Sequence, residues 1–196
     1  QLKNDMDVNQ ITNEEVEELH LAVKTIQRRS EGLSRFVQDF RNLTQIPKPV
    51  IAEVNVKEML EDVMLLHKKE VEEAGVELTL KVDSEKMFIN VDKSQIEQVV
   101  INLLKNAIQS FDEQTDRKVE VHAYYNDKSR PIIKVKDNGN GIDEEALEKI
   151  FIPFFTTKKN GSGIGLSLSR QIMRQHQGML GVKTKMDEGT EFSLRF

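Results

Sequence analysis

The sequence predicts an α+β fold in which a two-layer sandwich, one mixed sheet with helices on one face, follows a long helix. Three observations support this prediction. Segments with strict apolar and polar alternation, which is typical of half-buried strands, recur after residue 75, some of them as neighbouring pairs. Segments with apolar residues three and four positions apart lie between them and predict helices. The first quarter of the chain has only this helical pattern.

The composition narrows the class of protein. A chain of 196 residues with 38% hydrophobic residues can form one or two domains with a core. The absence of cysteine excludes disulfides and thiolate metal sites, and the net charge of −5 without a basic stripe argues against a nucleic-acid binder. No apolar run approaches the roughly 18–20 residues of a membrane span. We therefore expect a cytoplasmic protein with no membrane contact in this stretch, although a longer protein could be anchored upstream.

Residues 13–46 form the predicted long helix. Its positions step by alternating threes and fours, a heptad pattern made by Val16, Leu19, Val23, Ile26, Ser30, Leu33, Val37, Phe40 and Thr44. A helix of roughly 50 Å with one apolar stripe is not stable alone. We expect it to self-associate, with packing against the chain's own second domain as the alternative. The ten residues before it predict a polar loop, and Thr12 with Glu15 matches a capping box.

Two prolines, Pro47 and Pro49, end this helix because neither can continue it. We expect three parts: a helical segment over 1–46, a linker over 47–53 and a domain over 54–196. The elements expected in this domain are a helix over 56–73, strands over 76–82 and 87–91, a helix over 95–110, strands over 118–125 and 132–136, a short helix over 143–150, a helix over 165–176, and closing strands over 180–185 and 190–196.

The helix over 95–110 carries unusual polar residues beside its apolar face. Asn102 and Asn106 lie four positions apart, so their side chains project together from one side of the helix. Asparagine is a poor helix former, roughly 0.5–0.7 kcal/mol worse than alanine, which favours a ligand-binding role for both residues. The alternative is that these amides only border the core.

Five of the ten glycines fall in two clusters, Asp137-Asn138-Gly139-Asn140-Gly141-Ile142 and Gly161-Ser162-Gly163-Ile164-Gly165-Leu166. Glycine is needed where the backbone turns sharply or approaches a ligand closely. The second cluster opens a helix, so its amides and the positive helix end can face phosphate. Neither a P-loop nor a dinucleotide fingerprint fits. The chain has no G-x-x-x-x-G-K-[ST] run, and the G-x-G-x-G of the second cluster follows a polar loop, whereas the dinucleotide fingerprint follows a strand.

Together these residues resemble the ATP-binding boxes of sensor histidine kinases, in the ATPase group that includes gyrase, MutL and the ninety-kilodalton heat-shock chaperone. The resemblance rests on the asparagine helix, both glycine clusters, and the run Phe151-Ile152-Pro153-Phe154-Phe155-Thr156-Thr157-Lys158, which is similar to that of nitrogen-regulation sensor kinases. It covers about three quarters of the chain. It implies that the long helix is the second helix of a dimerisation and phosphotransfer hairpin.

The resemblance implies binding of ATP or ADP with Mg²⁺. Asp137 would accept a hydrogen bond from the adenine amine, and the Thr190 hydroxyl would support the same pocket. Asn106 would ligate the metal; a turn-forming Asp and an ordinary strand Thr are the alternatives. The glycines of the second cluster would cradle the phosphates. The full expected set is Asn102, Lys105, Asn106, Asp137, Gly139, Gly141, Ile142, Thr157, Lys158, Gly161, Ser162, Gly163, Ile164, Gly165, Leu166 and Thr190.

Three of these residues are also expected to act in catalysis: Asn102, Asn106 and Lys158. In hydrolysing members of the wider group a glutamate acts as a base at the position of Asn102. An amide cannot take a proton, so phosphoryl transfer to a protein nucleophile is favoured over hydrolysis. Lys158 and Lys105 are phosphate contacts in this interpretation, and ordinary surface lysines in the alternative one.

The implied function is the catalytic core of a sensor histidine kinase, which donates the γ-phosphoryl group of ATP to a histidine for relay to an aspartate on a response-regulator receiver domain. The family's acceptor histidine is followed by an acidic residue and, soon after, a proline. None of His20, His67, His122 and His176 has this context. We expect the acceptor upstream of Gln1 and no self-phosphorylation. The alternatives are another ATPase or serine kinase of the group, or a non-catalytic nucleotide-binding dimerisation scaffold.

Overall fold

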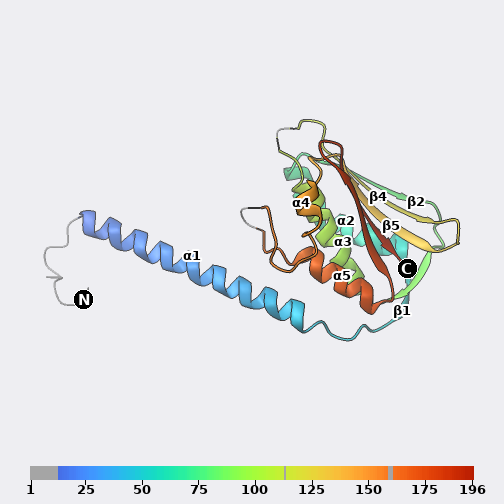
Figure 1. Cartoon of the computed structure of the whole chain (residues 1–196), viewed down its shortest axis with the longest axis horizontal. Coiled ribbons are helices and arrows are strands. Elements are labelled where there is room, and N and C mark those ends of the chain that lie inside the picture. The colour runs from blue at the N-terminus through green and yellow to red at the C-terminus, as the bar shows by residue number, and fades with distance from the viewer. Residues whose placement is uncertain (1–12, 113, 159–160) are drawn as a thin grey trace. The chain divides into compact units, whose positions relative to one another are not determined.

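The computed structural model describes residues 13–112, 114–158 and 161–196 (Figure 1). Contacts divide the chain into two compact units, Gln1–Thr44 and Gln45–Phe196. The polar loop expected over the first ten residues and the capping role expected of Thr12 lie outside the described residues. The boundary at Thr44 is close to the expected end of the helical segment at residue 46.

The first unit contains one long helix, α1 (Asn13–Thr44). Its heptad side chains are exposed in the single chain: Val16, Leu19, Val23, Ile26, Leu33, Val37 and Phe40. Removing such a stripe from water would stabilise the helix, which is the reason to expect self-association through α1. This self-association stays a prediction. None of the described helices is long and apolar enough to cross a membrane.

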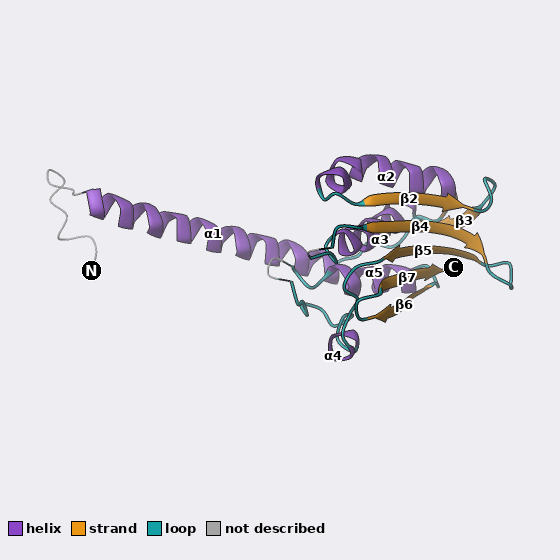
Figure 2. Cartoon of the chain, turned by 90° about the horizontal axis from the view of Figure 1, so that it is seen from above, coloured by secondary structure: helices purple, strands orange, loops and turns teal. Residues whose placement is uncertain are grey.

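The second unit is built on a five-stranded sheet with the order β2-β4-β5-β7-β6 (Figure 2). Its β2 and β4 strands are parallel, while the other neighbours are antiparallel. The expected mixed sheet is therefore confirmed. The strands are β2 (Glu77–Val82), β4 (Lys118–Tyr125), β5 (Pro131–Asp137), β6 (Met179–Lys185) and β7 (Gly189–Arg195).

Helices cover one face of this sheet, as expected for a two-layer sandwich (Figures 1 and 2). They are α2 (Val56–Glu73), α3 (Lys93–Ile108) and α5 (Gly165–Gln175), while α4 (Glu144–Leu147) is a single turn capped by Asp143. The helix α3 is central because it contacts α2, α5, β4 and β5. Its apolar face is buried through Ile96, Val99, Val100, Leu103, Leu104 and Ala107. This packing fixes the polar edge of α3 beside the ends of the strands.

A second, two-stranded sheet pairs β1 (Ala52–Asn55) with β3 (Phe88–Val91) in antiparallel register. The sequence predicted β3 but not β1, and Ala52 and Glu53 were expected in the linker. The strand β1 has only four residues and one buried side chain, Val54, so its alternation is too short to mark a strand. Its last residue, Asn55, also caps α2 by accepting from the amides of Lys57 and Glu58.

The chain before β1 is anchored to the start of α3. The amide of Val50 donates to Oδ2 of Asp92 at 2.9 Å, and Nε2 of Gln95 donates to the Pro47 carbonyl oxygen at 3.1 Å. The amide of Asp92 donates to Nε2 of His176 at 3.0 Å. The start of α3 is thus joined both to the end of α5 and to the segment that was expected to be a linker.

Candidate functional site

Asp137 is a buried carboxylate at the last position of β5. Its Oδ1 accepts three hydrogen bonds: from Ser110 Oγ at 3.0 Å, from the Gly139 amide at 2.9 Å and from the Thr190 amide at 3.3 Å. Among the described residues no donor is recorded for its other oxygen, Oδ2. One oxygen is therefore fixed by the protein, and the other can accept a hydrogen bond from a ligand.

Two opposing effects act on the pKa of the Asp137 carboxyl, and burial is the larger. Burial raises the pKa of the Asp137 carboxyl above its ordinary value, while the hydrogen bonds to Oδ1 and the nearby Lys158 ammonium act in the opposite direction. The carboxylate is held in place mainly by neutral donors. Its acceptor capacity is thus directed toward whatever lies at Oδ2.

Lys158 reaches from the loop after α4 to the polar edge of α3. Its Nζ lies 3.2 Å from Oδ1 of Asn106 and 3.1 Å from Oε1 of Gln109. Burial lowers the pKa of Lys158, and the charge of Asp137 opposes this shift. The structure therefore brings three predicted residues, Asn106, Asp137 and Lys158, into one electrostatic cluster.

Asn102, one turn earlier on α3, is used differently. Its Nδ2 donates to the Gly165 carbonyl oxygen and to Ser169 Oγ, each at 3.3 Å. The amide thus ties α3 to the first turns of α5, which agrees with the interpretation that it borders the core. An amide that donates in this way supplies no base for activating water, so its predicted place in the catalytic group rests on positioning.

The glycines of both clusters allow close contacts within the chain itself. A Cβ on Gly139 would lie 2.1 Å from Ser110 Oγ, and one on Gly163, whose φ is +69°, would lie 2.5 Å from the backbone of Phe154. The amide of Phe154 also donates to the Gly163 carbonyl oxygen at 2.9 Å. Packing against neighbouring loops therefore explains these two glycines, and their contact with phosphate stays a prediction.

The beginning of α5 suits an anion. Its N-cap residue, Ile164, makes no side-chain hydrogen bond to the first-turn amides. Helix N-termini carry partial positive charge and unpaired N–H groups, which bind phosphate well. The residues just before it, Gly161 and Ser162, are exposed. Their contact with a polyphosphate stays a prediction.

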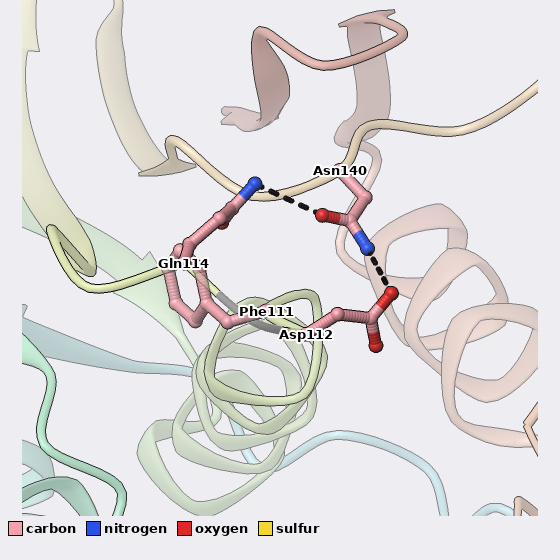
Figure 3. Close-up of a pocket in the computed structure, with 4 residues that line it drawn as sticks. All are labelled: Phe111, Asp112, Gln114 and Asn140. Atoms are coloured by element: carbon pink, nitrogen blue, oxygen red, sulfur yellow. Dashed lines mark hydrogen bonds between the residues drawn. The ribbon is translucent and has the colours of Figure 1, made fainter.

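A pocket of about 840 Å³ opens beside the first glycine cluster and is lined by Phe111, Asp112, Gln114 and Asn140 (Figure 3). Asn140 lies between the other polar side chains: it accepts from Gln114 Nε2 at 2.9 Å and donates to Asp112 Oδ2 at 2.5 Å. The backbone amide of Asn140 also donates to the Ser110 carbonyl oxygen at 3.0 Å. These contacts tie the first cluster to the chain that follows α3.

Comparison with known proteins identifies this arrangement. The family model described as histidine kinase-, DNA gyrase B- and HSP90-like ATPase matches residues 91–196, just over half of the chain. The chain belongs to this ATPase family. The matched region contains α3, both glycine clusters, Asp137, Lys158 and the strands that hold them. The resemblance inferred from the motifs is confirmed.

Among curated relatives of this ATPase, the histidine-protein kinase AtoS of Escherichia coli is 29% identical over 95% of the chain, and sporulation kinase A of Bacillus subtilis is 32% identical over 84%. The aligned parts are 30% and 27% of those proteins, so the chain spans about a third of their length or less.

Solved structures agree with this assignment. The catalytic domain of histidine kinase ThkA has a TM-score of 0.65 at 30% identity, covering 74% of the chain and 94% of that domain. ThkA in complex with the response regulator protein TrrA has a TM-score of 0.71 at 23% identity, covering 96% of the chain and 53% of that chain. The fold expected from the family is thereby confirmed.

Several predicted residues of the ATPase site lie at its edges. The Ile142 amide donates to Thr184 Oγ1 at 2.9 Å, and the same oxygen lies 3.0 Å from Thr190 Oγ1. Thr190 thus supports Asp137 through its backbone amide, whereas we expected its hydroxyl to serve the pocket. Lys105 and Thr157 are exposed, and no hydrogen bond of either side chain is recorded within the described part of the chain.

Sequence reasoning missed three residues of this site: Gln109, Ser110 and Thr184. No motif marks them, because each contributes through a partner from a distant segment. The amide side chains along the polar edge of α3 were the sequence feature that could have indicated a role for Gln109.

The histidines make structural contacts or lie on the surface. His67 pairs with Glu70 at 2.9 Å, His122 pairs with Asp83 at 2.8 Å, and His176 contacts the backbone at both ring nitrogens. His20 is exposed on α1. These contacts give His67, His122 and His176 structural roles.

Proposed function

We propose that this domain binds ATP with Mg²⁺ and donates the γ-phosphoryl group to a histidine on a protein acceptor, from which it passes to an aspartate of a response-regulator receiver domain. The observation that carries the proposal is the cluster of Asp137, Asn106 and Lys158, formed by three separate segments around one face of α3. The named histidine kinases among the relatives, and the ThkA complex with a response regulator, support the choice of acceptor and partner.

Each residue has a role that its position permits. Oδ2 of Asp137 accepts a hydrogen bond from the exocyclic amine of adenine, a donor that guanine does not present at the same place. Lys158 neutralises phosphate charge, and the α5 N-terminus supplies amide donors. Phosphoryl transfer depends mostly on such positioning and charge neutralisation. The protein nucleophile comes from the acceptor, so no base is needed at Asn102.

The residues also fit a magnesium ion. Among the described residues there is no group of three or more His, Cys, Asp or Glu side chains that could enclose a metal. Mg²⁺ at a nucleotide site keeps several waters and is held largely by phosphate oxygens, so it needs few protein ligands. Oδ1 of Asn106 is the amide oxygen that faces the Lys158 side of α3 and would serve as that ligand. A bound Mg²⁺ would neutralise charge on the phosphates.

The test is a titration followed by a transfer assay. Calorimetry should detect Mg-ATP binding, and radiolabelled ATP should then label an added helical polypeptide that carries a histidine before an acidic residue, with acid-labile and base-stable label. The Asp137→Asn variant should transfer less, while Asp127→Asn, at an exposed turn, should match the parent. Binding of Mg-ATP without labelled polypeptide or free phosphate would favour the non-catalytic scaffold, and absence of binding would contradict the proposal. Free phosphate without label would favour an ATPase, and acid-stable label would favour a serine kinase.

A further inference from the structure

We propose that Gln109 is a positioning residue that holds the Lys158 ammonium toward the nucleotide polyphosphate while Asn106 serves the metal. This inference rests on the proposed function. Gln109 is the C-cap residue of α3 and lies three positions after Asn106, so both amide oxygens face the same side of the helix end. Lys158 Nζ donates to both, at 3.1 Å and 3.2 Å respectively.

The neutrality of both acceptors is the first step of the argument. An amide oxygen binds an ammonium group without cancelling its charge, whereas a carboxylate would form an ion pair with it. Asp137 is the charged group that acts on Lys158, but within the described part of the chain the two form no ion pair. The positive charge of Lys158 therefore stays available to an incoming anion.

The second step concerns the two acceptors. Asn106 cannot place a divalent cation and the Lys158 ammonium at the same oxygen without strong repulsion between the two positive charges. Gln109 is then the acceptor that remains for Lys158. Without it, the lysine keeps the large rotamer entropy of a long, flexible side chain and has no fixed position in the site. A single exposed glutamine thus determines where the loop's positive charge is held.

The test compares ATP with adenosine, because only ATP carries the phosphates. Gln109→Leu should weaken Mg-ATP binding about 3- to 10-fold and leave adenosine binding unchanged. Gln109→Glu should weaken it at least as much, because the carboxylate pairs with Lys158 and repels phosphate. Gln98→Glu is the matched control: it makes the same change at an exposed position of the same helix, and it should bind both ligands as the parent does.

A double-mutant cycle separates positioning from direct contact. If Gln109 acts through Lys158, then Gln109→Leu should have no further effect in a Lys158→Met background. An equal loss in both backgrounds would overturn the inference and indicate a direct contact of Gln109 with nucleotide. Parent-like ATP binding by Gln109→Leu, with weakened binding by Lys158→Met, would also overturn it while leaving the proposed function intact. Parent-like ATP binding by Lys158→Met and Asp137→Asn would instead contradict the site on which the proposed function rests.

Discussion

The hydroxyl oxygen of Ser110 lies 3.0 Å from Oδ1 of Asp137, and this contact joins the end of α3 to the end of β5. The same hydroxyl lies 2.8 Å from the Ala107 carbonyl oxygen and leaves no room for a side chain at position 139. Ser110, Gly139 and Asp137 therefore form one packed unit. A change at any of them should affect the carboxylate that we assign to adenine.

The first prediction concerns Ser110. Ser110→Ala removes a donor that lowers the pKa of the Asp137 carboxyl, so this pKa should rise further above its ordinary value. We expect ATP affinity to fall about 3- to 10-fold near neutral pH, with a larger loss in acid, as measured by calorimetry across a pH series. Ser84→Ala, between β2 and β3, is the control. A pH-independent loss would show that Ser110 does not act on the carboxylate.

The second prediction is nucleobase selectivity. Asp137→Asn can turn an N–H donor toward the adenine amine, so binding of ATP and ADP should fall by about tenfold or more, as expected when a buried donor loses its acceptor. Binding of GTP, measured in the same competition assay, should change little. If both nucleotides lose affinity equally, Asp137 does not read the base.

The third prediction is that the same variant stabilises the fold. Because burial raises the folded-state pKa of Asp137, its contribution to stability is most favourable below the unfolded pKa of about 4 and is lost as pH rises through the folded value. Asp137→Asn should therefore melt roughly 2–4 °C above the parent near pH 7 without nucleotide, and the difference should vanish at about pH 3–4. Asp127→Asn should show no such shift. A parent-like melting temperature near pH 7 would show that burial does not penalise the charge.

The fourth prediction concerns the metal. Asn106→Leu removes the amide oxygen near Lys158, so ATP should bind this variant with the same affinity in Mg²⁺ and in EDTA. The parent should lose affinity in EDTA. Asn90→Leu, at an exposed position of β3, makes the same change away from the site and should keep the parent's metal response. A preserved Mg²⁺ effect in Asn106→Leu would assign the metal to other oxygens.

The fifth prediction concerns the anchored segment before β1. Burial alone would raise the pKa of Asp92, but hydrogen bonds from Val50, Ser94 and Gln95 outweigh it and lower this pKa below its ordinary value. The stability it contributes is thus present above the unfolded pKa of about 4 and is lost as pH falls through the folded value. Asp92→Ala should cost about 0.5–2 kcal/mol at pH 7, as for a lost helix cap, and less in acid. Denaturant unfolding at both pH values, with Asp127→Ala as the control, measures this. A cost that does not depend on pH would contradict the assigned role.

The sequence by itself determined most of the elements, with β1 as the exception, and the order of the motifs. Burial imposes a period of 3.6 on α3 and a period of two on β4, and both periods are visible in the residues. The sequence also placed Asp137 at the end of a strand and the second glycine cluster at the start of a helix. These features depend on neighbours within a few positions, so a linear reading reaches them.

The tertiary structure decided which groups meet. Ser110 and Asp137 are 27 positions apart, Lys158 and Gln109 are 49 apart, and Thr190 and Asp137 are 53 apart. The strand β1 depends on β3 for its hydrogen bonds, since its own four residues are too short a pattern to predict a strand. Hydrogen bonds and charge interactions act over a few ångströms of space, and only the packing of α3 against the sheet and α5 sets those distances.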